Sequence, residues 1–249
     1  MVGNKLIADQ LSYDNEEQTG LANQRIPTLN NGQCAAFDAI VNAVKTKSGQ
    51  TFFHYGPEGT GKTYVYNTVC YFLHGQGKIV ICVASSKTAS LFLMGGRTSH
   101  STFKIPIEIH EGSTCSIGKH SDLAGVIRAA DLVIWDEAPI QHCHIHEAVD
   151  RSSRDIRHCE DKPSGGLVVV FDFKQILPVI VNRSRPQIVG AYIQRSRVWQ
   201  CVKVLKLTEN MHVNTNVEAE KHFAKWQLDV GHGIFTNELG SMRLPDQMH

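Results

Sequence analysis

The sequence lacks a long apolar run, a secretory leader pattern, a C-x-x-C pair and an excess of charge of one sign. Without an apolar run or a leader, neither a membrane span nor secretion is expected. Seven cysteines without paired spacing favour a reducing intracellular compartment over a disulfide framework. Because 25 basic residues stand against 24 acidic ones, the net charge of +1 provides no overall field, and any polyanion must be bound locally.

Short apolar runs separated by helical periodicity dominate the middle of the chain. The runs that predict strands lie at 51–55, 78–83, 132–135 and 167–171, with a weaker one at 202–207. A helix is expected to begin near Asn30, because Phe37, Ile40 and Val44 recur on one helical face. This alternation predicts an α/β fold, with a mainly parallel sheet covered by helices on both faces.

The same patterning divides the 249 residues into three parts. Residues 1–28 are polar and are expected to form a loosely ordered lead-in. Residues 29–212 carry the α/β pattern and are expected to form the main domain. Residues 213–249 lose that pattern and are expected to be a C-terminal extension or the start of a second domain.

Residues 56–63 match the phosphate-binding pattern G-x-x-x-x-G-K-[ST] at every fixed position, between a predicted strand and a predicted helix. Backbone N–H groups of such a loop, together with the positive end of the following helix, bind phosphate oxygens. We expect Lys62 to reach the β- and γ-phosphates of a nucleotide and the Thr63 hydroxyl to bind Mg²⁺. The predicted nucleotide-binding residues of this loop are Gly56, Gly59, Thr60, Gly61, Lys62 and Thr63.

The apolar run at 132–135 ends in two carboxylates, Asp136 and Glu137. A P-loop enzyme needs acidic groups at the strand beside its phosphate loop. Asp136 is therefore expected to hold the Mg²⁺ shell, and Glu137 to orient and deprotonate the attacking water.

Six motifs then appear in one order along the chain. They are the loop at 56–63, Val-Ala-Ser-Ser at 83–86, Gly-Gly-Arg-Thr-Ser-His-Ser at 95–101, Ile-Trp-Asp-Glu-Ala-Pro at 134–139, Asp-Phe-Lys-Gln-Ile-Leu-Pro-Val at 172–179 and Leu-Thr-Glu-Asn-Met at 207–211. Over about residues 28–235 this series resembles the first motor domain of the petite-integration-frequency helicases, particularly the Helitron-transposon-like branch.

The resemblance implies a RecA-like P-loop domain of a superfamily-one DNA helicase. Such a protein hydrolyses ATP with Mg²⁺ and moves 5′ to 3′ on single-stranded DNA. The resemblance also implies a monomer in the nucleus that acts in DNA repair, recombination and telomere maintenance.

Two glutamines and several short polar side chains match residues with roles in the family. Gln33 resembles the adenine-reading glutamine, although Asn30 and Gln33 also fit a helix capping box, and both interpretations remain open. Gln175 resembles the γ-phosphate sensor of the family, which lies between the nucleotide site and the DNA site. The residues that match single-strand contacts of the family are Ser85, Ser86, Thr98, His100 and Ser101, and Lys87 adds a possible phosphate contact. Phe103 is the nearby aromatic, and we expect it in the core.

Three departures from the family pattern predict weak activity. No glycine pair separates Phe171 from Asp172, so Gln175 is expected to shift by up to about 7 Å unless the strand ends early. His212 stands where the family has an arginine that reaches the γ-phosphate, which predicts slow hydrolysis. The motifs of a second motor domain are absent from the sequence, so we expect Mg-ATP binding with little unwinding.

Two other functions stay open at this point. Another P-loop NTPase, such as a nucleotide kinase or a transport ATPase, would explain the loop and Asp136 but not the motifs at 95–101 and 172–179. A nucleotide-dependent DNA-binding module without turnover would fit His212.

The segment 142–146, His-Cys-His-Ile-His, has the side chains of a metal site, and His158 and Cys159 follow it. It lacks the paired spacing that is typical of zinc ligands, so the sequence favours core or surface roles for these residues.

Overall fold

A single parallel sheet of six strands organises the protein. The computed structural model describes residues 4–57, 59–172 and 184–211. All strand pairs are parallel, in the order β3-β2-β4-β5-β1-β6. The strands are β1 (Thr51–Tyr55), β2 (Val80–Ala84), β3 (Arg97–Thr98), β4 (Leu132–Asp136), β5 (Val168–Asp172) and β6 (Val202–Lys206). The five predicted strands are confirmed, and the short β3 is added at one edge.

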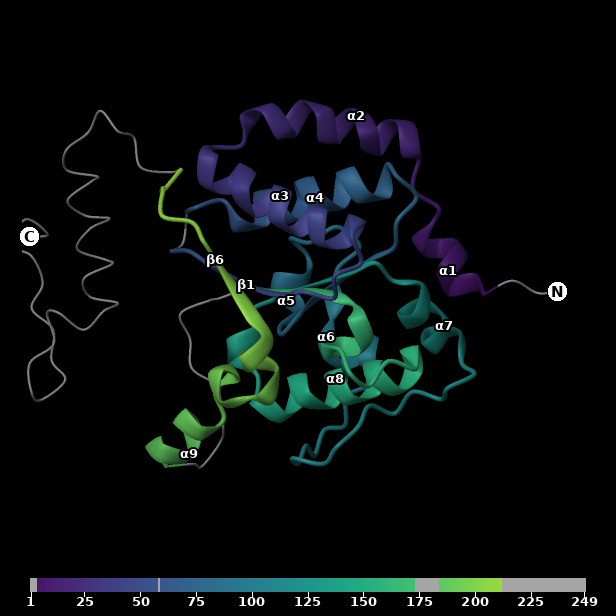
Figure 1. Cartoon of the computed structure of the whole chain (residues 1–249), viewed down its shortest axis with the longest axis vertical. Helices are drawn as coiled ribbons and strands as arrows, with labels where there is room; N and C mark the ends of the chain where they lie inside the picture. Colours follow the sequence, from purple (N-terminus) through teal and green to yellow (C-terminus); the bar gives the residue numbers. More distant parts are fainter. Residues whose placement is uncertain (1–3, 58, 173–183, 212–249) are drawn as a thin grey trace, which may run out of the picture.

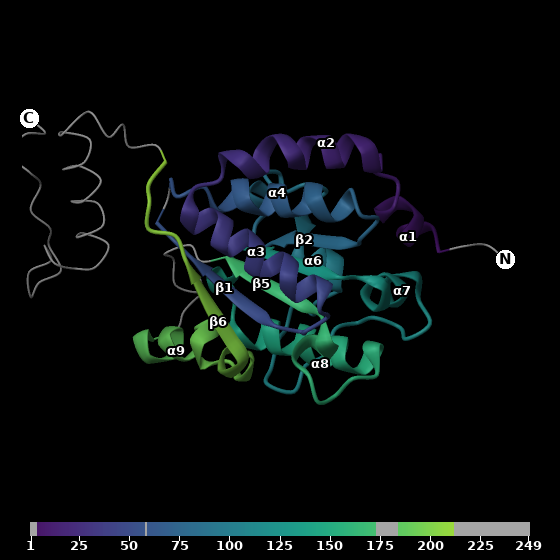
Figure 2. The same ribbon diagram turned by 45° about the horizontal axis from the view of Figure 1, so that its top comes forward.

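Helices lie on both faces of this sheet (Figures 1 and 2). The α-helices are α1 (Lys5–Gln10), α2 (Asn15–Arg25), α3 (Asn31–Lys45), α4 (Lys62–His74), α5 (Lys87–Ser90), α6 (Ser99–Phe103), α7 (Asp122–Ala129), α8 (Cys143–Arg157) and α9 (Arg185–Gly190). Short 3₁₀ helices are η1 (Ile26–Thr28), η2 (Ala138–Ile140), η3 (Pro163–Gly166), η4 (Ile193–Arg195) and η5 (Arg197–Cys201). In the described residues, no helix has both the length and the apolar character that a membrane span needs.

Two hydrophobic cores, one on each face, explain why the strand sequences are apolar throughout. Phe52 of β1 and Ile134 of β4 belong to the core under α3 and α4. Their neighbours Phe53 and Trp135 belong to the core against α7 and α8. Because side chains alternate across a strand, a sheet that is buried on both faces requires continuous apolar runs. The predicted two-sided α/β architecture is confirmed.

The N-terminal segment is more regular than the sequence indicated, because Lys5–Gln10, Asn15–Arg25 and Ile26–Thr28 form helices. The Asp14 carboxylate accepts hydrogen bonds from the first turn of α2, and Ala22 of the same helix is buried at 1% exposure. The Arg25 guanidinium lies 3.8 Å from the ring centre of Tyr64 in α4. A cap and a cation–π contact, rather than an apolar stripe, hold α2 in place, so apolar periodicity did not predict it. The domain boundaries at 212 and 213 stay a prediction.

Candidate nucleotide and DNA site

The predicted site residues that the structure describes gather at one edge of the sheet. In a parallel sheet all carboxyl ends lie on the same side, where ligands bind. The phosphate loop follows β1, Asp136 ends β4 and Asp172 ends β5. β5 lies between the other two strands, so the strand that ends in Asp136 is one strand away from β1 rather than directly beside it. β2 lies on the other side of β4, so the segment that begins at Ser85 borders the same edge. Residues that are far apart in the sequence thus share one surface.

The glycines of the loop are required by its backbone. Gly59 and Gly61 adopt φ angles of 82° and 78°, a region that other residues rarely occupy. A Cβ on Gly61 would lie 2.5 Å from Nε2 of Gln33, and one on Gly56 would lie 2.7 Å from Oγ1 of Thr60. Side chains at these positions would therefore distort the loop. Glu58 lies outside the described residues.

Lys62 is the first residue of α4, and its side chain folds back over the phosphate loop. Its Nζ donates to the carbonyl oxygens of Gly56 at 2.6 Å and Pro57 at 3.3 Å. Thr63 follows in the first turn, where the free N–H groups and the dipole of a 13-residue helix favour an anion. The roles of Lys62 and Thr63 in holding phosphate and metal stay predictions.

The Gln33 side chain makes two sets of hydrogen bonds. Its Oε1 accepts the backbone N–H of Asn30 at 3.1 Å, and Asn30 Oδ1 accepts the N–H of Gln33 at 2.8 Å. This confirms the capping box. Its Nε2 donates to the carbonyl oxygen of Thr60 at 3.0 Å. Gln33 therefore connects the start of α3 to the phosphate loop, and its adenine-reading role stays a prediction.

Asp136 and Glu137 are buried at the end of β4, with exposures of 9% and 6%. Oδ1 of Asp136 accepts the backbone N–H of Glu137 at 2.8 Å. Glu137 adopts a left-handed conformation with φ of 55°, which is uncommon for a residue with a side chain. Strained backbone of this kind clusters at functional sites, and here it redirects the chain immediately after the strand.

Asp172 is a third buried carboxylate at this edge, and a chain of hydrogen bonds holds it. The Tyr66 hydroxyl donates to Oδ1 of Asp172 at 2.6 Å, and Nδ1 of His54 lies 2.9 Å from the same hydroxyl. Since the hydroxyl has one proton, it accepts from His54, which fixes the Nδ1–H tautomer. Burial and the charge of Lys62 lower the pKa of His54 to about 3, so the ring is neutral at physiological pH.

The charge of Asp172 is linked to the rest of the site. Burial raises the pKa of this carboxyl well above its usual range, Lys62 lowers it, and Asp136 raises it again.

Tyr66 and His54 were not predicted from the sequence as part of the site. A polar residue inside an apolar strand, as His54 is in β1, was the available signal.

Replacing Tyr66 by phenylalanine is expected to destabilise the fold by about 1–3 kcal/mol, because buried His54 Nδ1 loses its hydrogen bond and buried Asp172 loses one of its hydrogen bonds. Urea unfolding measures this loss. Tyr71→Phe, which removes a hydroxyl from a half-buried residue of the same helix, is the control. Equal stability of the two variants would show that the hydrogen-bond chain does not contribute.

The donor set at the sheet edge fits a magnesium ion. Mg²⁺ prefers hard oxygen ligands and is commonly held by one or two carboxylates together with substrate phosphates. Asp136 supplies a carboxylate at the end of β4, and Thr63 supplies a hydroxyl in the first turn of α4. Thr63 and Asp136 are thus the residues that would hold the ion.

Two serines connect the predicted DNA-binding segment to Glu137, the predicted catalytic carboxylate. The Ser85 hydroxyl donates to the carbonyl oxygen of Glu137 at 2.8 Å, and the Ser86 hydroxyl donates to Oε2 of Glu137 at 2.8 Å. Ser86 Oγ also accepts the N–H of Ala89 and so caps α5. Lys87, the next residue, is exposed. The two segments therefore share a direct hydrogen-bonded contact.

Ser86→Ala is expected to lower nucleotide turnover by about 10- to 100-fold, because Glu137 loses a hydrogen bond to its charged group worth about 1.5–3 kcal/mol. Steady-state hydrolysis measures the loss, and Ser86→Thr is expected to restore it. Ser121→Ala removes a similar cap from α7 and is the matched control. Equal losses in Ser86→Ala and Ser121→Ala would assign the effect to capping alone.

The segment around β3 and α6 forms a separate polar cluster. The Thr98 hydroxyl donates to Ser101 Oγ at 2.8 Å, and Ser101 Oγ donates to the Thr98 carbonyl at 2.9 Å. His100 Nδ1 lies 3.2 Å from Nε2 of Gln141, and burial lowers the pKa of this histidine. Ser101 is exposed, and Thr98 and His100 are half-buried. Their predicted contacts with a single strand stay a prediction.

Phe103 is buried as predicted, at 1% exposure, and stacks on Trp135 with ring centres 5.6 Å apart. Leu91 and Phe92, which were not predicted from the sequence, are 76% and 65% exposed directly after α5. Exposed aromatics beside a basic residue are the side chains on which unpaired bases stack.

Two predicted residues, Gln175 and His212, lie outside the described part of the chain. β5 continues through Phe171 to Asp172, which pairs with His54 of β1. The strand therefore does not end early, which was the condition that could have compensated for the missing glycine pair.

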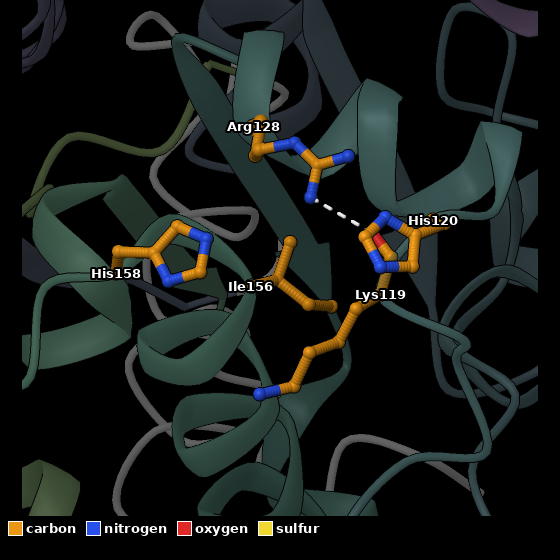
Figure 3. Close-up of a pocket in the computed structure, with 5 residues that line it drawn as sticks. All are labelled: Lys119, His120, Arg128, Ile156 and His158. Carbon is orange, nitrogen blue, oxygen red and sulfur yellow. Dashed lines mark hydrogen bonds between the residues drawn. The ribbon is translucent and has the colours of Figure 1, made fainter.

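A separate pocket of about 240 Å³ lies between α7 and α8 (Figure 3). Its lining residues are Lys119, His120, Arg128, Ile156 and His158. Arg128 donates to the carbonyl oxygen of Lys119 at 3.0 Å, and the Lys119 ammonium pairs with Asp155 at 2.7 Å. The end of α7 leads into β4, and the end of α8 leads towards β5. The pocket is thus at the amino edge of the sheet, opposite the phosphate loop.

The fold and the loop with its buried carboxylates define the class of RecA-like P-loop domains. The family model described as PIF1-like helicase matches residues 28–240. The chain belongs to this PIF1-like helicase family.

Curated relatives and solved structures agree with this family. The chain is 31% identical over 137 residues to ATP-dependent DNA helicase Pif1 of Psychrobacter sp. (strain PRwf-1), covering 53% of this chain and 20% of the relative. It is 27% identical over 217 residues to ATP-dependent DNA helicase Pif1 of Bdellovibrio bacteriovorus, covering 83% and 44%. The chain therefore spans less than half the length of these relatives.

The structural likenesses support the fold. The structure of Pif1 helicase from Candida albicans matches with a TM-score of 0.66 at 18% identity, covering 88% of this chain and 45% of that one. Pif1 helicase from Bacteroides, in complex with ADP-AlF3 and ssDNA, matches with a TM-score of 0.63 at 22% identity, covering 79% and 46%. These likenesses show the RecA-like α/β fold that the sequence predicted.

Proposed function

We propose that this chain is the ATP-binding motor domain of a DNA helicase, which couples ATP hydrolysis to 5′-to-3′ movement along single-stranded DNA. Its membership in the PIF1-like helicase family supports the proposal. The solved Bacteroides relative in complex with ADP-AlF3 and ssDNA supports a role for both ligands. A nuclear role in repair, recombination and telomere maintenance belongs to the proposal on the resemblance alone.

The observation that carries the proposal is the hydrogen bond between Ser86 and Glu137. It joins the segment that would contact DNA to the carboxylate that would activate water, at a distance of 2.8 Å. A strand of DNA that moves α5 would therefore move Glu137. This contact gives a physical route by which DNA can change the rate of hydrolysis.

The residues have distinct tasks in this reaction. Lys62 would neutralise charge on the β- and γ-phosphates, and the loop N–H groups would hold their oxygens. Bound Mg²⁺, held by Thr63 and Asp136, would supply additional charge stabilisation at the phosphates. Glu137 would orient the attacking water and accept its proton.

Hydrolysis of ATP with and without single-stranded DNA tests the proposal. Turnover that rises with added single strands is expected of a motor domain. Turnover that is indifferent to DNA would instead indicate a different P-loop NTPase. The Lys62→Ala protein serves as the background control in both conditions.

A second candidate function is a nucleotide-dependent DNA-binding module without turnover. The histidine at position 212 favours it, because a histidine cannot supply the permanent forked charge of an arginine. Nucleotide binding that changes DNA affinity while no phosphate is released would support this module over the motor.

Phe92→Ala is expected to weaken single-strand binding by about 5- to 100-fold, because stacking on an aromatic side chain contributes about 1–3 kcal/mol per base. Fluorescence anisotropy of a labelled oligothymidine measures this affinity. Ile107→Ala, which truncates an apolar side chain that is 97% exposed, is the matched control. Unchanged affinity in Phe92→Ala would remove this residue from the DNA surface.

A further inference from the structure

Three metal-ligating side chains meet at the start of α8, away from the nucleotide site. His142, Cys143 and His144 each place one ligand atom within 4.8 Å of the other two. Cys143 Sγ is 3.6 Å from Nδ1 of His142 and 3.8 Å from Nδ1 of His144. The residue types of a metal site were evident in the sequence, but the segment lacks the paired spacing that is typical of zinc ligands, so no site was predicted here.

The helix cap explains why consecutive residues converge. His142 is the N-cap of α8 and has extended backbone angles, φ −61° and ψ 138°. The chain turns sharply between this residue and the first helical turn, which brings its imidazole back over Cys143 and His144. His142 Nδ1 accepts the backbone N–H of His144 at 3.2 Å. A metal ion bound to His142 Nδ1 would replace this capping hydrogen bond with a coordinate bond.

The spacing of these atoms fits tetrahedral coordination. Zinc binds sulfur at about 2.3 Å and imidazole nitrogen at about 2.0–2.1 Å, so a tetrahedral angle separates the two donors by about 3.6 Å. The observed separations from Cys143 Sγ are 3.6 and 3.8 Å. A small adjustment of rotamers would place one ion among the three side chains.

Glu147 is not part of this three-residue cluster, but it lies one helical turn later beside His144 and is placed to supply a fourth ligand. Its Oε2 lies 3.2 Å from Nδ1 of His144, and its Oε1 accepts the backbone N–H of Arg197 at 3.2 Å. Outer contacts of this kind orient metal ligands. Arg151 Nη1 lies 3.9 Å from Oε2 of Glu147, but Nε and Nη2 of Arg151 donate to the carbonyl oxygen of Ser113. The Ser196 side chain also hydrogen-bonds to this carboxylate, and His144 is the histidine that the carboxylate contacts.

We propose that His142, Cys143, His144 and Glu147 bind a zinc ion in a structural role. The cysteine thiol releases its proton to solvent, and thiolate and carboxylate together balance the charge of the ion. Cys143 N–H donates to the Ala191 carbonyl at 2.8 Å, so the ion would hold the start of α8 against the segment before η4. α8 also carries His146, whose Nε2 lies 3.0 Å from the carbonyl oxygen of Ala138, just after the catalytic carboxylates.

Cobalt(II) titration of the whole chain, stripped of metal and free of any affinity tag, tests the site. One equivalent of cobalt is expected to bind with the visible bands of tetrahedral coordination and a thiolate-to-cobalt charge-transfer band, and zinc is expected to displace it. Cys143→Ser should lose the charge-transfer band. Cys201→Ser, which alters an exposed cysteine, should keep it.

Ligand variants and unfolding complete the test. His144→Gln and Glu147→Gln are expected to weaken zinc binding by at least about tenfold, and zinc is expected to raise the unfolding midpoint of the unsubstituted protein. Far-ultraviolet circular dichroism confirms that each variant is folded. The proposal is overturned if cobalt gives no charge-transfer band, if Cys143→Ser keeps it, or if zinc leaves the unfolding midpoint unchanged.

Discussion

Replacing Glu137 by glutamine is expected to leave nucleotide binding intact and to lower hydrolysis by about 10²–10⁴-fold, the contribution of a positioned general base. Glutamine keeps an acceptor at the position of Oε2, so the Ser86 hydroxyl can still donate to it as it does to Glu137. The substitution therefore removes the negatively charged carboxylate that would act as the base, while it preserves the geometry at this edge of the sheet. Phosphate release under single-turnover conditions, with nucleotide affinity measured separately, distinguishes chemistry from binding.

Glu108→Gln is the matched control, because it makes the same change at an exposed position. It is expected to hydrolyse ATP at the rate of the unsubstituted protein. If Glu137→Gln also kept that rate, the base would have to be another group at the sheet edge. Asp172 would be the first alternative to examine, since burial already raises its pKa well above the usual range.

Replacing Lys62 by alanine is expected to lower hydrolysis by about 10²–10³-fold, as the loss of one preorganised donor to transition-state charge does. The substitution removes the ammonium that lies over the phosphate loop, 2.6 Å from the Gly56 carbonyl. It also removes the positive charge that lowers the pKa of Asp172. Steady-state hydrolysis measures the loss of turnover. Binding of a fluorescent ATP analogue shows how much of that loss comes from weaker nucleotide binding.

Lys45→Ala, at an exposed position in the last turn of α3, is the control for Lys62→Ala. It should bind and hydrolyse nucleotide normally. A Lys62→Ala protein with full turnover would contradict the assignment of the phosphate loop, because no other part of the account replaces that charge.

The nucleotide half of the site could be predicted from sequence because its chemistry is local. A phosphate loop requires glycines at fixed positions, and the φ angles of Gly59 and Gly61 meet that requirement. The strand that ends in Asp136 was visible as an apolar run. Its neighbours in the sheet were not visible, since strand order depends on long-range packing rather than on adjacent residues.

The features that the sequence did not predict depend on contacts between distant segments or on the direction of single side chains. α2 is held by a cap and by Arg25 against Tyr64, neither of which gives an apolar stripe. The link from Ser86 to Glu137 joins residues 51 positions apart. His142 meets its neighbours only because a helix cap turns the backbone. Motif spacing alone contains none of this information.

The central claim is that nucleotide and single-stranded DNA bind to one coupled edge of the sheet. The most direct measurement is the affinity of the chain for a labelled oligothymidine with and without a saturating non-hydrolysable ATP analogue. We expect the DNA affinity to change by about fivefold or more, with an equal reciprocal effect of DNA on analogue binding. Identical DNA affinities in the two conditions, with the analogue shown to be bound, would contradict it.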